Sequence, residues 1–365
     1  MTQNYRFGEI CDVLNGRAYK QNELLSSGKY PVLRVGNFFS SDRWYYSDME
    51  LPENKYCDNE DLLFAWSASF GPKIWDGGKV IYHYHIWKLV PDTSKADKYY
   101  LYYWLKHSVN RLTAGTHGSV MAHMTKGDME NQQIELPSLD VQKKVSSILK
   151  TLDDKIKLNN EINSNLEQQV SSLYQAWFEN YINSNGVQPE TWSFVTLSDI
   201  ADVNSGKRPP MRSSEKTDDA QIPLVGAASI MGFTSEANHS DKILVTGRVG
   251  THGVIQRFNT PCWTSDNTLV ITSKYYEYVC QILKRIDYTS MNRGSTQPLI
   301  TQGDMNKVTV LLPDIDTLNE FERIAGTLMA QYEANVIEND GLANIRDALL
   351  SKLMSGEIDL SNISI

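Results

Sequence analysis

Residues 139–181 read LDVQKKVSSILKTLDDKIKLNNEINSNLEQQVSSLYQAWFENY, a stretch that contains neither proline nor glycine. Alternating steps of four and three residues meet side chains that are apolar or, near the middle, asparagine: Val145, Leu149, Leu152, Ile156, Asn159, Asn163, Leu166, Val170, Leu173 and Trp177. Such a seam predicts a long helix that packs its apolar stripe on a partner helix. A helix of about 40 residues spans about 60 Å, which is long for one globular domain.

The partner helix is predicted at 314–354, because the same seam returns 176 residues further along the chain. Its positions, which are apolar or asparagine apart from Arg346, are Phe321, Ala325, Leu328, Tyr332, Asn335, Asn339, Leu342, Arg346, Leu349 and Leu353. The repeat continues upstream, where TKGDM at 125–129 matches TQGDM at 301–305. A second echo, offset by 190 residues, pairs Ile10, Asp12, Val13 and Gly16 with Ile200, Asp202, Val203 and Gly206. The chain is therefore a duplication of a domain followed by a long helix.

Two copies of such a unit pair most simply about a two-fold axis, which makes the helices antiparallel. Antiparallel pairing sets Asn159 opposite Asn339 and Asn163 opposite Asn335. A buried amide layer lowers the stability of a coiled coil but fixes its register, because a slipped register places an amide against leucine. We expect these four asparagines to set the register; the alternative is that they are partly solvated and specify nothing.

The composition predicts a globular protein without a membrane-spanning segment. Of 365 residues, 41% are hydrophobic and 22% are charged, and no run approaches the roughly 18 apolar residues that a span requires. The first residues, MTQNYRFGEI, lack the apolar segment of a signal peptide, and the four cysteines are too scattered for a zinc motif. We therefore expect a cytoplasmic protein with no disulfide framework, no metal site and no membrane partner.

The net charge of −9 is only a weak argument against a nucleic-acid partner, because the acidity is local. Residues 314–365 carry 3 basic and 10 acidic residues, whereas 1–138 carry 15 and 16, and 186–313 carry 12 and 12. Each nearly neutral domain is able to present a basic face while the second helix and the tail hold the negative charge.

The sequence carries no catalytic signature. The GxxxxGK[ST] phosphate loop, the GxGxxG dinucleotide fingerprint, the HExxH zinc motif and the NPPY or DPPY motif of amino-methyltransferases are absent. His83 and His85 fall on one face of a predicted strand without a third ligand, so they do not predict a metal site. We expect no catalytic residue in this chain.

The predicted elements mix strands with helices, without a clear βαβ repeat, which indicates an α+β fold. In the first domain we expect a strand that leads into a loop at 30–38, strands at 62–66, 80–89 and 133–136, a turn-rich loop at 67–73 and an aromatic-rich helix at 98–107. In the second domain we expect strands at 222–226 and at the start of 242–253.

Polar, glycine-punctuated loops provide the candidate ligand contacts. Arginine forks onto guanine, glutamine onto adenine, and serine, threonine and lysine bind phosphate oxygens, so these loops suit DNA, although surface loops are polar in any protein. The candidate DNA-binding residues are Arg17, Lys20, Arg34, Asn37, Ser67, Ser69, Lys73, His117, Ser119 and Lys126 in the first domain, and Lys207, Arg208, Arg212, Arg248, Thr251, His252, Arg293, Ser295, Thr296 and Gln297 in the second.

The order of these features resembles the specificity subunits of type I restriction–modification systems. The resemblance covers nearly the whole chain: a domain ending in TKGDM, helix 139–181, a second domain ending in GST and TQGDM, and helix 314–354. IADVNSGK at 200–207 and RVGTHG at 248–253 are also similar to that family. The resemblance implies target-recognition domains at 1–137 and 186–313, spacer helices at 138–185 and 314–357, and a tail at 358–365, with the domains in a pseudo-two-fold arrangement about an antiparallel coiled coil.

The same resemblance implies the partners. Each domain is expected to recognise one half of a split target in double-stranded DNA, while the helices hold the half-sites about one helical turn apart. Two methyltransferase subunits would dock on the chain and carry S-adenosylmethionine, and restriction subunits would carry ATP and Mg²⁺. The chain itself is expected to be a non-catalytic DNA-binding subunit without a cofactor.

Two other interpretations remain open at this point. A non-enzymatic scaffold whose tandem domains bind protein would explain the acidic second helix equally well. A fragment of a fused restriction–methyltransferase polypeptide is disfavoured, because the catalytic motifs are absent.

Overall fold

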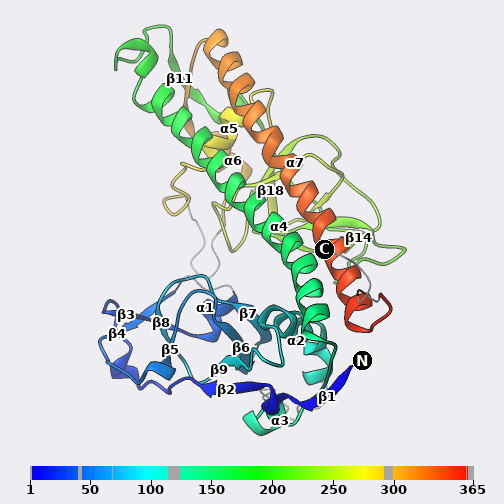
Figure 1. Cartoon of the computed structure of the whole chain (residues 1–365). Coiled ribbons are helices and arrows are strands. Elements are labelled where there is room, and N and C mark those ends of the chain that lie inside the picture. The colour runs from blue at the N-terminus through cyan, green and yellow to red at the C-terminus, as the bar shows by residue number, and fades with distance from the viewer. Residues whose placement is uncertain are drawn as a thin grey trace. The chain divides into compact units, whose positions relative to one another are not determined.

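The computed structural model describes residues 2–39, 43–67, 69–113, 124–291, 299–358 and 360. The chain forms two compact units, one of residues 1–158 and 338–365 and the other of residues 159–337. Each unit contains one sheet-rich domain and one half of each long helix (Figure 1). Each long helix is thus divided between the two units, whereas the sequence analysis predicts each helix as a segment of its own beside the domains.

The two predicted long helices are present. Helix α4 spans Leu139–Tyr174 and continues into a π-helical turn, Gln175–Glu179, while helix α7 spans Ile315–Met354. Asp314 caps α7, because its Oδ1 accepts a 2.9 Å hydrogen bond from the backbone N–H of Thr317. Trp192 Nε1 donates to the same carboxylate at 2.8 Å and ties this cap to the second domain.

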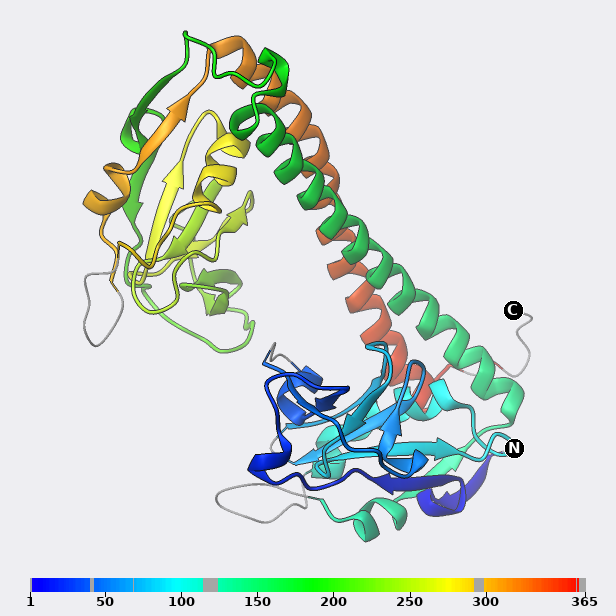
Figure 2. The same ribbon diagram turned by 90° about the vertical axis from the view of Figure 1, so that its left-hand side faces the viewer.

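The seams of the two helices are buried against each other within each unit. In unit 1, Val145 and Leu149 of α4 share a core cluster with Leu350 and Leu353 of α7. In unit 2 the cluster contains Val170, Tyr174 and Phe178 from the end of α4, and Phe321, Ala325 and Met329 from the start of α7. Because the end of one helix packs on the start of the other, the pair is antiparallel, as predicted (Figure 2).

Arg346, the exception in the second seam, has a partner on the first helix. Its Nη1 lies 2.7 Å from Oδ1 of Asp153 on α4, and Tyr103 Oη donates to the other oxygen of Asp153 at 2.7 Å. The guanidinium therefore replaces an apolar contact with an ion pair at the edge of the seam.

The described residues of the domain of unit 1 form two sheets and a separate two-stranded ribbon. The ribbon pairs β1 (Gln3–Arg6) with β10 (Gln133–Leu136). One sheet has the order β2 (Cys11–Asn15), β9 (Ile86–Pro91), β6 (Leu62–Ser67) and β7 (Ser69–Ile74). The other has the order β4 (Tyr45–Ser47), β3 (Tyr30–Leu33), β8 (Val80–Tyr82) and β5 (Tyr56–Cys57). The helices are α1 (Val35–Phe39), α2 (Lys98–Thr113) and α3 (Lys126–Glu130).

The domain of unit 2 repeats this plan. Its ribbon pairs β11 (Ser193–Thr196) with β19 (Thr309–Leu312). One sheet has the order β12 (Asp202–Ser205), β18 (Thr268–Thr272), β15 (Ile243–Gly247) and β16 (Gln256–Phe258). The other has the order β14 (Ile230–Thr234), β13 (Ile222–Val225) and β17 (Trp263–Thr264). The helices are α5 (Tyr276–Leu283) and α6 (Gln302–Asn306).

The repeated TKGDM and TQGDM segments form the same N-terminal cap. Thr125 Oγ1 accepts from the backbone N–H of Asp128 at the start of α3, and Thr301 Oγ1 accepts from that of Asp304 at the start of α6. In each box the aspartate carboxylate in turn accepts a hydrogen bond from the backbone N–H of the threonine. The α+β class and the duplication are therefore confirmed.

Three predicted elements of the first domain are wrong. The strand expected at 80–89 is two strands, because β8 pairs with β3 and β5 in one sheet while β9 pairs with β2 and β6 in the other. A chain that passes between sheets must bend, and the bend falls at 83–85. The loop expected at 67–73 contains edge strand β7, whose Pro72 is tolerated because β7 pairs on one side only. The strand expected at the start of 30–38 is β3, which ends at Leu33, but helix α1 follows it in place of the expected loop.

The core of each unit is its own. In unit 1, Phe7, Phe64, Trp87 and Leu101 are among the side chains buried between the sheet of β2, β9, β6 and β7 and the helices. In unit 2, the corresponding cluster includes Leu244, Ile271, Tyr278 and Val279. In the described part of the chain, no helix has the length and apolarity needed to cross a bilayer.

Candidate nucleic-acid interface

A short bend between β8 and β9, residues 83–85, organises the polar end of the first domain. Arg17 N donates to Tyr82 O at 3.0 Å, and Gly16 N donates to Ile86 O at 3.3 Å, so the segment after β2 lies along both sides of the bend. A Cβ on residue 16 would lie 2.4 Å from the carbonyl oxygen of His83, a distance that backbone atoms cannot tolerate. Glycine is therefore required for this close approach.

A polar hollow of about 340 Å³ opens beside this bend. It is lined by Arg34 and residues 35–37 from the end of β3 and α1, by Arg43 and Tyr45 at the start of β4, and by His83 and His85 of the bend. The guanidinium carbons of Arg34 and Arg43 lie 5.1 and 5.3 Å from the Tyr45 ring centroid, so one ring orients both cations.

Asn37 holds the rim of the hollow together. Its Oδ1 accepts a 3.4 Å hydrogen bond from the backbone N–H of Arg34, and its Nδ2 donates at 2.8 Å to the backbone carbonyl of Arg43. Asn37 is a predicted DNA contact that lines the hollow, and its amide also positions the two arginines through these backbone hydrogen bonds.

The electrostatics of the hollow favour an anion. Among the described residues, Arg34 forms no ion pair with a carboxylate, so its charge remains available to a ligand. Burial lowers the pKa of His83 to about 4, with smaller contributions from His85 and Arg34. Burial, and then Arg34, also lower the pKa of His85. Both imidazoles are therefore mainly neutral at pH 7. The Nδ1 of His83 accepts a 3.5 Å hydrogen bond from the backbone N–H of His85, which leaves the Nε2–H of His83 as a donor.

The other candidates of the first domain are more dispersed. Arg17 forks onto Glu23 at 2.8 and 3.0 Å and lowers the pKa of that carboxyl to about 2. Lys73 Nζ donates to Phe38 O at 3.3 Å, and Lys126 pairs with Glu130 at 3.3 Å. Lys20 and Ser69 are exposed, whereas Ser67 is buried at the end of β6. His117 and Ser119 lie outside the described residues.

The candidates of the second domain surround the equivalent connection between β17 and β18. Lys207 N donates to Thr264 O at 2.9 Å, and Arg248 N donates to Asn267 O at 2.8 Å, so both chain segments lie against residues 265–267. Arg208 and Thr251 are exposed on the adjoining loops. Arg212 donates to Met231 O at 3.3 Å, and His252 Nδ1 lies 3.4 Å from Gly247 O. Arg293, Ser295, Thr296 and Gln297 lie outside the described residues.

Two asparagine pairs are predicted between the long helices, and one of them is hydrogen-bonded in the structure. Asn335 Nδ2 donates a 2.8 Å hydrogen bond to Asn163 Oδ1, and both residues are buried. Asn159 and Asn339 belong to different units, and their pairing stays a prediction.

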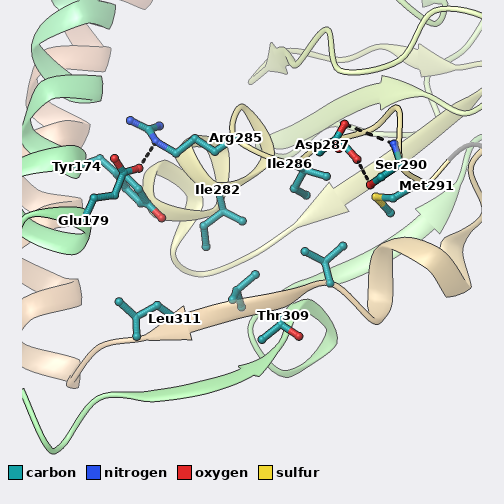
Figure 3. A pocket seen from close by; sticks show the side chains of 12 residues that line it. Tyr174, Glu179, Ile282, Arg285, Ile286, Asp287, Ser290, Met291, Thr309 and Leu311 are labelled. Atoms are coloured by element: carbon teal, nitrogen blue, oxygen red, sulfur yellow. Dashed lines mark hydrogen bonds and ion pairs between the residues drawn. The ribbon is translucent and has the colours of Figure 1, made fainter. Parts of the chain in front are cut away.

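A further hollow, about 400 Å³ in volume, lies in unit 2 and contains none of the predicted site residues (Figure 3). Its charged groups are satisfied by neighbours: Arg285 Nε lies 2.7 Å from Glu179 Oε1, and the guanidinium stacks over Tyr174 at 4.3 Å. Asp287 accepts hydrogen bonds from Thr289 and Ser290. We therefore regard this hollow as a structural junction between α5, β19 and the end of α4.

Several hollow residues were missed from the sequence. Arg43 and Tyr45 belong to no motif of the sequence, and His83 and His85 were assigned to a strand. The histidines were visible as a pair, but only the bend between the sheets brings them to Arg34. In the described parts of the chain, no cluster of three His, Cys, Asp or Glu side chains suits a metal ion.

Two copies of one domain frame, each carrying polar loops at the same place, define a duplicated recognition protein. The model of the type I restriction modification DNA specificity domain matches the chain twice, at residues 2–168 and 189–345. The chain therefore belongs to this family, and DNA target recognition is the function of its class.

Individual relatives agree with this assignment. The chain is 24% identical over 304 residues to the type I restriction enzyme MjaIX specificity subunit of Methanocaldococcus jannaschii, a match that covers 72% of this chain and 70% of the relative. It is 20% identical over 339 residues to the HindI specificity subunit of Haemophilus influenzae, covering 68% and 74%. The fold resembles the crystal structure of a type I S subunit from M. genitalium, with a TM-score of 0.61, 17% identity and coverage of 97% and 96%.

Proposed function

We propose that this chain recognises a bipartite site in double-stranded DNA, with one half-site read by each domain. The observation that carries the proposal is the duplicated frame, which places a polar bend with basic neighbours at the same position in both domains. Arg34 beside its hollow and Lys207 beside residues 265–267 supply cations for phosphate oxygens. Two neutral histidines and several amides supply groups that match base edges.

In this proposal the long helices determine the spacing between the half-sites. The seam of α4 and α7 is continuous over each unit's half of the pair, and such coiled coils resist changes of length and register. A rigid spacer fits half-sites that present the same groove about one helical turn, or about 10 bp, apart.

The chain directs partner subunits to the site and performs no chemistry itself. Methyltransferase subunits with S-adenosylmethionine, and restriction subunits with ATP and Mg²⁺, would supply methylation and cleavage. The helix pair carries exposed apolar side chains suited to docking such partners, including Leu158, Ile162, Val336, Ile337 and Ile345. Since the chain is expected to act inside the cell beside its DNA, a cytoplasmic location is part of the same proposal.

The test is the selection of bound duplexes from a random pool by the chain in complex with its methyltransferase partner. We expect a split motif with one fixed spacer, and binding that weakens as salt rises. Enrichment of one contiguous motif would contradict the recognition of one half-site by each domain. Absence of any salt-dependent DNA binding by the complex would favour the protein-binding scaffold instead.

A further inference from the structure

The two domains share a frame of hydrogen bonds that places one three-residue turn identically in each. In the first domain, Gly16 N and Arg17 N donate to Ile86 O and Tyr82 O at 3.3 and 3.0 Å. In the second, Gly206 N and Lys207 N donate to Thr268 O and Thr264 O at 3.1 and 2.9 Å. Residues 83–85 therefore correspond to residues 265–267.

Hydrogen bonds at the ends of β6 and β15 support the same correspondence. Trp66 N donates to His85 O at 3.1 Å, and Arg248 N donates to Asn267 O at 2.8 Å. The chain then returns to the same place in both domains, because Met124 N donates to Trp66 O at 3.3 Å and Ile300 N donates to Arg248 O at 3.0 Å. Each turn is held by main-chain groups from both sides.

Glycine fixes the backbone of both turns against the preceding segment. A Cβ at residue 206 would lie 2.1 Å from the carbonyl oxygen of Ser265, just as one at residue 16 would lie 2.4 Å from that of His83. Because main-chain bonds and glycine contacts set these turns, their side chains are free to differ while the backbone stays the same.

The side chains of turn 83–85 and turn 265–267 differ in their chemistry as well as in their size. The first turn presents His83, Tyr84 and His85, and Trp66 meets the His85 ring at 5.3 Å. The second turn contains Ser265, which is buried, followed by Asp266 and Asn267, with Arg248 in the place of Trp66. Asp266 and Asn267 are exposed, and within the described parts of the chain neither side chain has a hydrogen-bond partner.

We propose that turn 83–85 and turn 265–267 are the specificity-determining elements of the two half-sites. This inference rests on the proposed function and names the residues through which it acts. A carboxylate accepts hydrogen bonds only, so Asp266 selects a base with an exocyclic amino group, cytosine or adenine. Asn267 pairs with adenine through a donor and an acceptor. The first turn, with neutral imidazoles beside Arg34, selects bases by mixed donor and acceptor contacts.

The first test transplants one turn onto the other. The triple variant H83S/Y84D/H85N is purified in complex with the methyltransferase partner, and bound duplexes are selected from a random pool beside the wild-type complex. We expect the first half-site to change at one or two base pairs, while the second half-site and the spacer stay the same. The unchanged second half-site serves as an internal control for folding and assembly.

The second test is a near-isosteric change in the other domain. In Asp266→Asn, the new amide donor should reduce the preference for cytosine about 10-fold or more and favour adenine. Asp202→Asn, at an exposed position on β12, is the matched control and should leave both half-sites unchanged. The inference is wrong if both turn variants select the wild-type motif. It is also wrong if the triple variant does not fold and D266N selects the wild-type motif. If the wild-type complex itself selects no split motif, the proposed function fails instead.

Discussion

Asn335 donates a 2.8 Å hydrogen bond to Asn163 across the buried seam of α4 and α7. Gln331 Nε2 in turn donates to Asn335 Oδ1 at 2.7 Å, so the pair belongs to a short amide chain along α7. A polar pair in an otherwise apolar seam specifies one alignment of two helices, because every other alignment buries an unpaired amide.

Replacing Asn163 alone should destabilise unit 2 more than replacing the pair. Asn163→Leu leaves the Asn335 Nδ2 donor buried without its acceptor, a loss of about 1–3 kcal/mol, whereas N163L/N335L removes both polar groups and should be at least as stable as the wild type. Urea unfolding of the four members of this cycle measures the coupling. Asn165→Leu, at an exposed position on α4, should change stability by less than about 0.5 kcal/mol. Additive single losses would show that the two amides are not coupled.

Lengthening the helix pair should change the spacer of the DNA site. A heptad inserted in α4 preserves the seam but lengthens one helix by about 10 Å, so selected duplexes should show a different spacer and the same half-sites. An insertion of equal length between Asp218 and Asp219, two exposed loop residues outside the candidate contacts and outside the helices, is the control. An unaltered spacer after the heptad insertion would count heavily against a measuring role for the helices.

Removing the Arg34 charge should weaken DNA binding in a salt-dependent way. If the guanidinium neutralises one phosphate, Arg34→Ala should reduce the slope of log affinity against log salt by about 1. Asn37→Ala should produce a smaller loss, because it frees the backbone that positions Arg34 and Arg43. Arg6→Ala is the control, since Arg6 is exposed and pairs only loosely with Glu9 at 3.9 Å. Identical salt slopes for Arg34→Ala and Arg6→Ala would remove the hollow from the DNA interface.

The free energy of unfolding of unit 2 should fall as the pH rises from about 4.5 to 7, because of Glu322. Its carboxyl accepts hydrogen bonds from the backbone N–H groups of Glu277 and Tyr278 at 3.1 and 2.7 Å, yet burial raises its pKa to about 7. A carboxyl with a raised folded-state pKa binds its proton more tightly in the folded than in the unfolded protein, so stability falls as pH rises through this window. The change should be on the order of 3 kcal/mol.

Glu322→Gln is the variant that isolates this effect. The amide cannot ionise, so the fall in stability across the window should flatten, although one of the two N–H groups loses a carboxylate acceptor. Thermal unfolding at pH 5, 6 and 7 measures it, with Glu320→Gln as the exposed control on the same helix. An unchanged pH dependence in Glu322→Gln would assign the effect to another group.

Two kinds of glycine should respond oppositely to alanine. Gly16→Ala forces a methyl group onto the His83 carbonyl, so it should destabilise unit 1 and disturb its half-site. Gly326 and Gly341 lie in α7, where an added Cβ meets nothing within 4 Å, and alanine there should stabilise by about 1 kcal/mol each. Thermal unfolding distinguishes the two. A neutral Gly16→Ala would mean that the turn at 83–85 is not held by this contact.

Much of the fold was predictable because it is encoded locally. The seams of α4 and α7 repeat in steps of three and four, and a helix needs only neighbouring residues to form and one stripe to bury. The capping boxes at Thr125 and Thr301 are likewise read directly from the sequence. Antiparallel pairing followed from the duplication, since two copies of one unit pair about an axis.

The candidate site was predicted only in outline. Arg34 and Asn37 were predicted as DNA contacts, and both line the hollow. Arg43 and Tyr45 were not predicted, and His83 and His85 were considered only as a metal-binding pair. Alternation of apolar and polar residues suggested one strand at 80–89, because a periodic pattern does not show which sheet each half joins.

The sequence by itself therefore determined the duplication, the two long helices and the amide positions in their seam, since periodicity and repeated motifs report local structure and a shared stripe. Only the tertiary structure decided where the chain bends between sheets and which polar residues meet there. Those contacts join segments far apart in the chain, such as Gly16 with His83 and Trp66 with His85. Because they are made by main-chain groups that every residue carries, no pattern of side chains in the sequence predicts them.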